Sequence, residues 1–174
     1  RIFEQRYIDM VRECSASDSC FGICLLDTPQ DKNPNIPCMT IGTMAAICDW
    51  STLEDGLLGI AVEGRQVFSI LNTRARNNGL LIAEVSVWPE ADVIQLPEQY
   101  SVLSMIADRF MEKLGKQYPA FASQQLEDAV WVGYRLAELL PFSNFEKQDM
   151  LALSDPMERL QKLLELLPRF QKEG

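Results

Sequence analysis

The segment 36–90 constrains the fold more than any other part of the chain, because it consists of short apolar runs separated by turn signals. Four of these runs have the length and composition of β-strands: Met39–Asp49, Leu57–Val62, Val67–Arg76 and Leu80–Trp88. In the last run, every second position is apolar: Leu81, Ala83, Val85 and Val87. Such alternation places these side chains on one face of a sheet. Several short antiparallel strands of this kind favour a β-barrel or a β-sandwich.

Turn-forming dipeptides separate the runs. Asn78-Gly79 predicts a two-residue hairpin turn, because both residues tolerate the positive φ that such a turn needs. Glu63-Gly64 is a weaker signal of the same kind, and Asp55-Gly56 closes a loop after Trp50. We therefore expect hairpins between successive strands.

The residues before this segment predict a helix, a strand and a loop. Ile2–Cys14 mixes apolar and charged residues in an imperfect helical stripe, and Phe21–Leu26 is a short apolar strand. Gly22 leaves room in that strand for a close backbone approach. Thr28–Pro37 is rich in proline and polar residues, which predicts a surface connection, although long loops of this kind can also carry function.

The apolar pattern changes to a helical period from Glu98 onward. A first helix carries one stripe and stops at Gly115: Leu103, Ile106, Ala107, Phe110, Met111 and Leu114. A second helix is predicted from Ser123 to Leu140, with a core face of Leu126, Ala129, Val130, Gly133, Leu136, Ala137 and Leu140. Ser143–Glu146 matches a capping box, and Asp155-Pro156 predicts the start of a fourth helix. We therefore expect an α+β chain with a strand-rich subdomain at 1–95 and a helical bundle at 96–174.

Trp131 lies opposite the core face of the second predicted helix. A large apolar ring is rarely left on a charged helix face, so we expect it to pack against a second surface, most simply the strand-rich part. The alternative is a partly exposed ring covered by the stem of Arg135.

Charge and cysteine content disfavour several classes of function. The chain has 25 acidic and 16 basic residues and a net charge of −9, which disfavours binding to nucleic acid or to anionic membranes. No apolar run reaches the ~18–20 residues of a membrane span, and no secretory signal is visible. The five cysteines lack a regular spacing, so we expect reduced, structural thiols in the cytoplasm.

The sequence carries no recognisable catalytic motif. It lacks the phosphate-binding G-x-x-x-x-G-K-[ST] loop, the G-x-G-x-x-G fingerprint and the G-x-S-x-G elbow. It also has no histidine, the commonest general base and metal ligand. Carboxylate pairs such as Glu54 and Asp55 sit next to turns, where solvated charge is the ordinary explanation. We therefore expect a non-catalytic protein without cofactor or metal.

Three motifs in the expected order resemble the Lon N-terminal (substrate-recognition) domain family. Arg1–Val11 is similar to the R-I-F-E-x-R-Y-x-x-M element at the start of that domain. Gly42–Ile47, then Asp55-Gly56 and Gly64–Phe68, is similar to its G-T-x-A-x-I, D-G and G-x-R-R-F-x-I order. Asp128–Pro141 resembles its helical half, especially in short stand-alone bacterial members.

This resemblance implies a PUA-like pseudo-barrel followed by a helical bundle. It also implies a role in capturing polypeptides, without ATPase or peptidase chemistry. Two features depart from the family. Gln66 stands where the family often has a basic residue, and the proline-rich strand that usually precedes R-I-F-E is absent. Since the chain starts at Arg1 without an initiator methionine, we expect that a preceding barrel strand is missing from this sequence.

Two hypotheses about function remain open. The first is a polypeptide-binding or adaptor domain, with unfolded or tagged polypeptides as ligands and a protease or chaperone as a further partner. The second is an RNA-binding PUA-like module, whose site would use Trp50 for stacking and a basic patch of Arg65, Arg74 and Arg76. The ordinary explanation of these arginines is solvated strand charge. An interaction domain with another ligand, or an enzyme with an unrecognised site, is a further alternative.

Overall fold

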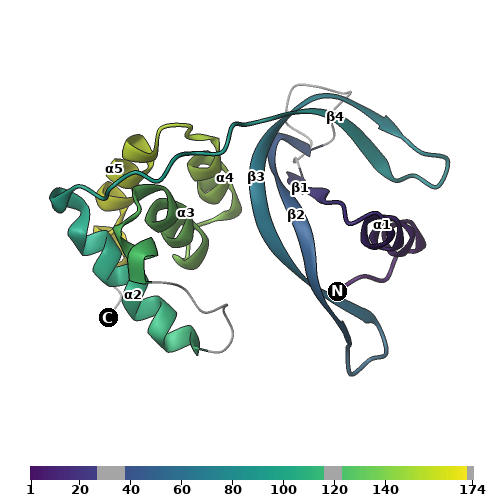
Figure 1. The fold of residues 1–174 in the computed structure, drawn as a ribbon, viewed down its shortest axis with the longest axis horizontal. Helices are drawn as coiled ribbons and strands as arrows, with labels where there is room; N and C mark the ends of the chain where they lie inside the picture. Colours follow the sequence, from purple (N-terminus) through teal and green to yellow (C-terminus); the bar gives the residue numbers. More distant parts are fainter. Residues whose placement is uncertain (27–37, 116–122, 172–174) are drawn as a thin grey trace. The chain divides into compact units, whose positions relative to one another are not determined.

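A computed structural model describes residues 1–26, 38–115 and 123–171, so the predicted loop Thr28–Pro37 lies outside the described residues. The chain forms two compact units, Arg1–Glu90 and Ala91–Gly174 (Figure 1). The first contains an antiparallel sheet and the second contains helices, which confirms the α+β class. The contacts divide the chain after Glu90, whereas the sequence analysis places its boundary after Gln95. The Leu96 amide donates to the Glu127 carbonyl (2.7 Å) and Gln95 pairs with Asp128, so these residues belong with the helices.

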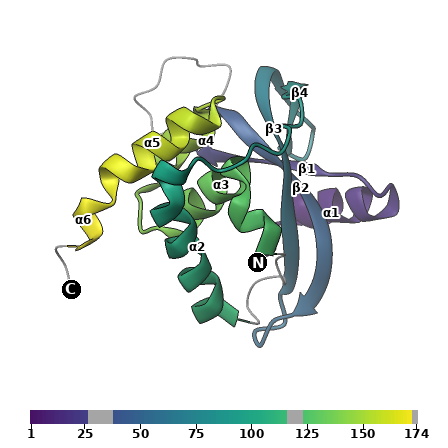
Figure 2. The ribbon, with the colours of Figure 1, turned by 60° about the vertical axis from the view of Figure 1, so that its left-hand side comes forward.

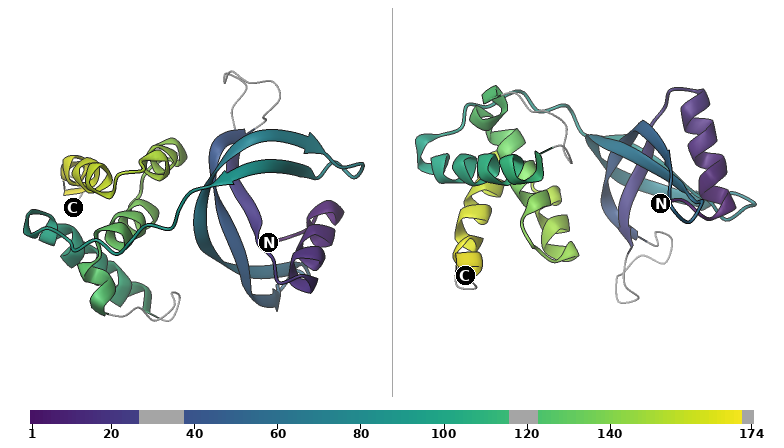
Figure 3. Two further views of the ribbon diagram at one scale, coloured as in Figure 1. Left: turned by 45° about the horizontal axis from the view of Figure 1, so that its top comes forward. Right: turned by 90° about the horizontal axis from the view of Figure 1, so that it is seen from below.

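Four antiparallel strands form the sheet of the first unit in the order β1-β2-β3-β4. They are β1 (Phe21–Leu26), β2 (Cys38–Thr52), β3 (Leu58–Ala75) and β4 (Leu81–Val87). The sheet curls, and helix α1 (Gln5–Ala16) lies on its concave side (Figures 1 and 3). The helix begins later than predicted, because Ile2 forms an isolated antiparallel bridge with Leu58 instead of a first helical turn.

The predicted strands Leu57–Val62 and Val67–Arg76 are one strand, β3, and the predicted turn at Glu63-Gly64 is wrong. Both residues pair with β2 inside the sheet, Glu63 with Ala46 and Gly64 with Ala45. The register shifts next to this pair, as it does at a β-bulge. Glycine is found at bulges as well as at turns, so the local signal does not separate the two structures.

The predicted hairpin at Asn78-Gly79 is present, but its turn contains three residues. The Arg76 amide donates to the Leu80 carbonyl (2.8 Å), and residues 77–79 lie between them. Gly79 has φ +79°, whereas Asn78 does not have a positive φ. The Asn78 side chain instead accepts a hydrogen bond from the Leu80 amide (3.1 Å). This is a turn with one left-handed glycine that ends the loop, and not the two-residue turn that the sequence predicts.

The turn between β2 and β3 has the same construction. The Leu53 amide donates to the Leu57 carbonyl (2.9 Å), and Gly56 has φ +78°. Asp55 takes the role that Asn78 has in the other turn, because its carboxylate accepts from the Leu57 amide (3.1 Å). The predicted loop at Asp55-Gly56 is therefore confirmed, and an Asx residue followed by glycine ends each of these hairpins.

Phe68 occupies the centre of the sheet core and is 2% exposed. Its ring requires glycine on two neighbouring strands. A Cβ atom on Gly42 would lie 2.6 Å from the Phe68 ring, and one on Gly22 would lie 2.9 Å from it. Gly22 therefore makes room for a side chain rather than for backbone. The apolar face of β4 predicted from alternation, which contains Leu81 and Val87, is less buried than predicted. Leu81 is 40% exposed and Val87 is 43% exposed.

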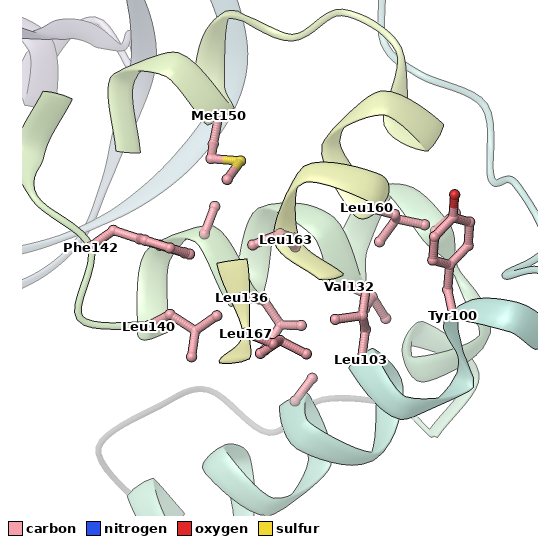
Figure 4. Close-up of a cluster of buried hydrophobic side chains, with 13 residues drawn as sticks. Tyr100, Leu103, Val132, Leu136, Leu140, Phe142, Met150, Leu160, Leu163 and Leu167 are labelled. Atoms are coloured by element: carbon pink, nitrogen blue, oxygen red, sulfur yellow. The ribbon is translucent and has the colours of Figure 1, made fainter. Parts of the chain in front are cut away.

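The second unit packs its helices around one apolar core (Figures 2 and 4). Its elements are η1 (Glu98–Tyr100), α2 (Ser101–Leu114), η3 (Ser123–Glu127), α3 (Ala129–Leu139), α4 (Asn144–Ala152), α5 (Pro156–Leu166) and α6 (Pro168–Gln171). The fully buried residues of this apolar core include Leu103, Val132, Leu136, Met150, Leu160 and Leu163. The capping box of Ser143 and Glu146 is confirmed at the start of α4. Asp155 caps α5 as predicted, because its carboxylate accepts from the Met157 amide (2.8 Å).

The helix predicted from Ser123 to Leu140 is interrupted at Asp128. Its carboxylate accepts from the Val130 amide (3.0 Å) and thereby caps α3. The same oxygen accepts from the Ile94 amide (3.3 Å) in the preceding extended segment. Most of the predicted core face of α3 is buried, but Val132 is fully buried and Val130 is only partly buried.

Two aromatic residues of α3, Trp131 and Tyr134, each contact an arginine side chain. Trp131 packs at the margin of the helical core, and the Arg135 guanidinium lies 5.3 Å from its ring centroid. This agrees with the alternative in which Arg135 covers the ring, while packing of Trp131 on the strand-rich part stays a prediction. Arg159 is 1% exposed, and its guanidinium lies 3.7 Å from the ring centroid of Tyr134. It donates to the carbonyls of Met150 (3.0 Å) and Leu153.

The tight packing around Gly42 leaves no room for a side chain at this position of β2. The Cβ of Gly42→Ala would lie 2.5 Å from Cys24 Sγ and 2.6 Å from the Ile23 carbonyl, so neighbours must shift. We expect a loss of about 1–3 kcal/mol in the free energy of unfolding, measured by urea titration. Gly64→Ala is the matched control, because its nearest neighbour is Thr43 Cγ2 at 3.3 Å. Equal stability changes in the two variants would contradict this account.

Candidate functional site

The residues selected from the sequence for RNA binding do not gather in one patch. Trp50 is 44% exposed and pairs with Ile60, close to the β2–β3 turn. Arg74 and Arg76 lie at the opposite end of β3, beside the β3–β4 turn. Arg65 lies between these two groups on the same strand. A stacking surface next to a basic patch is therefore not formed by these four side chains.

Two of the three arginines in this group are ion-paired. Arg76 Nη1 donates to both carboxylate oxygens of Glu13 in α1, at 2.9 and 2.7 Å. Arg65 Nη2 lies 2.9 Å from a Glu63 carboxylate oxygen. Arg74 borders a shallow hollow of about 230 Å³ on the hairpin, together with Glu84. Each arginine has an acidic neighbour, so a role of these residues in binding stays a prediction.

The ionisable groups with shifted pKa values have structural roles. Burial, together with a smaller contribution from the adjacent Cys38, raises the pKa of the Cys24 thiol to about 12. A thiol held in its neutral form is a poor nucleophile and a poor metal ligand. Burial also lowers the pKa of Arg159, although the neighbouring Tyr134 opposes that shift. In the described part of the chain, no three side chains of the histidine, cysteine, aspartate and glutamate type converge on a possible metal position.

Apolar side chains are exposed chiefly on the strand-rich unit. In order along the chain they are Phe3, Tyr7, Ile23, Leu26, Trp50, Val62, Leu71, Leu81 and Val87. Those in β1 and β4 lie on the two outermost strands of the sheet. Exposed apolar side chains beside open strand edges are typical of surfaces that bind other polypeptides. Within the described ranges, none of the helices combines the length and apolarity of a membrane span.

The continuity of β3 through Glu63-Gly64 is the feature of this sheet that sequence reasoning missed. Among the described residues, β4 pairs with β3 only from Phe68 to Ala75. A signal was available, since each true hairpin turn has aspartate or asparagine before its glycine, whereas Gly64 follows glutamate.

Comparison with known proteins places this chain in a family. A family model described as the ATP-dependent protease La (LON) substrate-binding domain matches residues 1–169. A Lon protease from Vibrio parahaemolyticus is 30% identical over 129 residues, which are 71% of this chain and 16% of that protease. A Lon protease from Escherichia coli K12 is 27% identical over 133 residues, or 74% of this chain and 17% of that protease. The chain thus spans about one sixth of the length of these curated relatives.

Solved structures show the same fold. A Lon N-terminal domain protein from Xanthomonas campestris has a TM-score of 0.75 and 33% sequence identity, covering 95% of this chain and 86% of that one. The N-terminal domain of the Mycobacterium avium complex Lon protease has a TM-score of 0.53 at 18% identity, covering 83% and 75% of the two chains. The second likeness concerns the fold alone.

The capping glutamate of α4 gives a test based on pH. Hydrogen bonds from Arg169 and Ser143 lower the pKa of Glu146 from 4.5 to about 2. Because the folded-state pKa is lowered, ionised Glu146 stabilises the fold above the unfolded-state pKa. That stabilisation is lost as pH falls through the folded-state value. In thermal melts, Glu146→Gln should be less stable than the parent at about pH 7, and the difference should shrink to zero as the pH falls below about 2. Glu112→Gln in α2 is the control, and a difference independent of pH would contradict the assignment.

Proposed function

Because the chain belongs to the ATP-dependent protease La (LON) substrate-binding domain family, we propose that it is a non-catalytic domain that recognises polypeptides. The match of the family model to residues 1–169 is the observation that carries this proposal. The ligands are unfolded or tagged polypeptides, and the domain serves as a substrate-recognition or adaptor unit. The two compact units are its subdomains, one strand-rich and one helical.

The chemistry of the described surface supports a polypeptide ligand over RNA. Sequence-independent RNA binding depends on lysine and arginine contacts to phosphate, together with exposed aromatic rings. Here the net charge is −9, and Arg65 and Arg76 already pair with Glu63 and Glu13. The strand-rich unit instead exposes aliphatic side chains on the outermost strands of the described sheet, a combination suited to an extended chain.

We also propose a bacterial, cytoplasmic setting and a protease or chaperone as the protein that receives the bound polypeptide. The named relatives are bacterial Lon proteases, which supports both parts of this proposal. The five cysteines lack the regular spacing of a disulfide framework, as expected in a reducing compartment.

A comparison of binding affinities at two salt concentrations distinguishes the two ligand classes. We expect a fluorescently labelled, reduced and carboxymethylated protein, which stays unfolded, to bind the chain in fluorescence anisotropy. Raising salt from about 50 to about 200 mM should change this affinity by less than about threefold, because few ion pairs are formed. A single-stranded RNA of similar length is the comparison ligand. Tighter binding of the RNA, with a loss of at least about tenfold over the same salt range, would contradict the proposal.

A further inference from the structure

Two cysteine side chains meet in the core of the strand-rich unit. Cys24 lies in β1, and Cys38 is the first residue of β2. Cys38 forms a buried cluster with Phe68 and Ile70, and Cys24 packs against this cluster. A side-chain hydrogen bond joins Cys24 to Cys38, so their two sulfur atoms are neighbours. We name these two residues the β1–β2 thiol pair.

A glycine on the neighbouring strand gives the Cys24 thiol its place in this core. Gly42 pairs with Cys24, and a Cβ atom on Gly42 would lie 2.5 Å from Cys24 Sγ. The same Cβ atom would lie 2.6 Å from the Phe68 ring. Since Phe68 and Cys38 belong to one buried cluster, the Cys24 thiol lies on the side of the sheet that buries Cys38.

The β1–β2 thiol pair lies where the ladder between the two strands is irregular. Cys24 pairs with Gly42 and Leu26 pairs with Cys38, so two residue steps along β1 correspond to four along β2. The register therefore shifts between Cys24 and Leu26. Regular main-chain pairing is interrupted beside the two sulfur atoms, and a covalent bond between them would join the strands across this interruption.

We propose that Cys24 and Cys38 form a reversible disulfide that links β1 to β2 covalently when a peroxide is the oxidant. The Cys24 sulfur attacks one oxygen of hydrogen peroxide, the O–O bond breaks, and the thiol proton leaves with hydroxide as water. The Cys38 sulfur then attacks the resulting sulfenic acid, the S–O bond breaks, and a second water molecule leaves. The two sulfurs lose two electrons in total to the peroxide.

The reverse step needs a dithiol as reductant. One thiolate of the dithiol attacks a sulfur of the bridge, and its second thiolate releases Cys24 and Cys38 as thiols while the dithiol itself becomes a disulfide. The β1–β2 thiol pair therefore has a reduced and an oxidised form. This switch does not depend on the proposed function.

Burial determines how readily the β1–β2 thiol pair reacts. Because the Cys24 thiol is held in its neutral form and the thiolate is the reactive species, its oxidation is slow. The pair therefore stays reduced in an ordinary reducing compartment and responds to sustained exposure to peroxide.

The other cysteines have different surroundings and serve as internal references. The Cys14 thiol donates to the Cys20 carbonyl oxygen (3.8 Å), so it is directed at the main chain of Cys20. Cys48 is exposed, and its thiol donates to the Ala46 carbonyl (3.6 Å). A bridge between Cys14 and Cys20 is therefore the competing product.

Peptide mapping of the parent chain tests the pairing without any variant. The reduced protein is treated with excess hydrogen peroxide for several hours, and its remaining thiols are alkylated in denaturant. After digestion without reductant, tandem mass spectrometry should identify a bridge between Cys24 and Cys38 that dithiothreitol removes. Cys24 and Cys38 that are still free, or a Cys14–Cys20 bridge as the main product, would overturn the proposal.

Alanine variants separate the roles of the two cysteines. In Cys38→Ala, the sulfenic acid on Cys24 has no thiol to resolve it, so dimedone should label Cys24 at least about tenfold more than in the parent. Cys48→Ala is the matched control and should form the bridge as the parent does. Equal labelling of Cys24 in the parent and in Cys38→Ala would show that Cys38 is not the partner.

Thermal melting tests whether the bridge stabilises the linked strands. The disulfide closes a loop of about 15 residues, so the oxidised parent should melt at least about 5 °C above the reduced parent. Dithiothreitol should reverse this shift, which distinguishes it from the oxidation of methionine. Peroxide-treated Cys24→Ala should show no such reversible shift. A bridged parent that melts at or below the temperature of the reduced parent would overturn the link between β1 and β2 as a stabilising device.

Discussion

The pairing of β2 with β3 is the interaction on which the strand-rich unit depends. It is the longest ladder in the sheet, extending from the Thr52–Leu58 pair at one end to the Ile41–Ser69 pair at the other. Its bulges bend the two strands, and the bent sheet has a concave side on which α1 lies (Figure 3). Phe68 sits near one end of the ladder and fixes the spacing of neighbouring strands, because Gly22 and Gly42 leave space for its ring. The same long ladder carries β3 beyond the part that pairs with β4.

The helical unit is organised differently, because a buried charge lies beside its apolar core. The Arg159 side chain spans the connection between α4 and α5 and donates to the Met150 and Leu153 carbonyls. Burying a guanidinium costs free energy unless polar partners replace water, and here two carbonyls and the Tyr134 ring supply part of that compensation, while Arg159 Nη1 has no hydrogen-bond partner among the described residues. Gly133 on α3 makes room for the stem, since its Cβ would lie 3.2 Å from Arg159 Cδ. Helices α3, α4 and α5 are thereby fixed by one side chain in addition to the apolar packing.

Charge pairing on the strand-rich surface bears on function. Arg65 and Arg76 are paired with carboxylates, which leaves aliphatic side chains and strand edges as the distinctive features of this surface. Aliphatic side chains do not select a particular ligand sequence, which suits the proposed role of a substrate-binding domain. The helical core explains stability in its unit and need not contact a ligand (Figure 4).

The sequence by itself determined the α+β class, the two hairpin turns, the caps at Ser143 and Asp155, and the family, because each depends on residues close together in the chain. The prediction from sequence was wrong at Glu63-Gly64 and at Asp128, because a glycine or an aspartate at these positions is compatible with two local structures. Tertiary pairing decided between them: β2 holds Gly64 in a strand, and the Ile94 amide helps Asp128 to interrupt a helix. The burial of Arg159 was likewise decided only by the fold, because the sequence does not state which charge is enclosed.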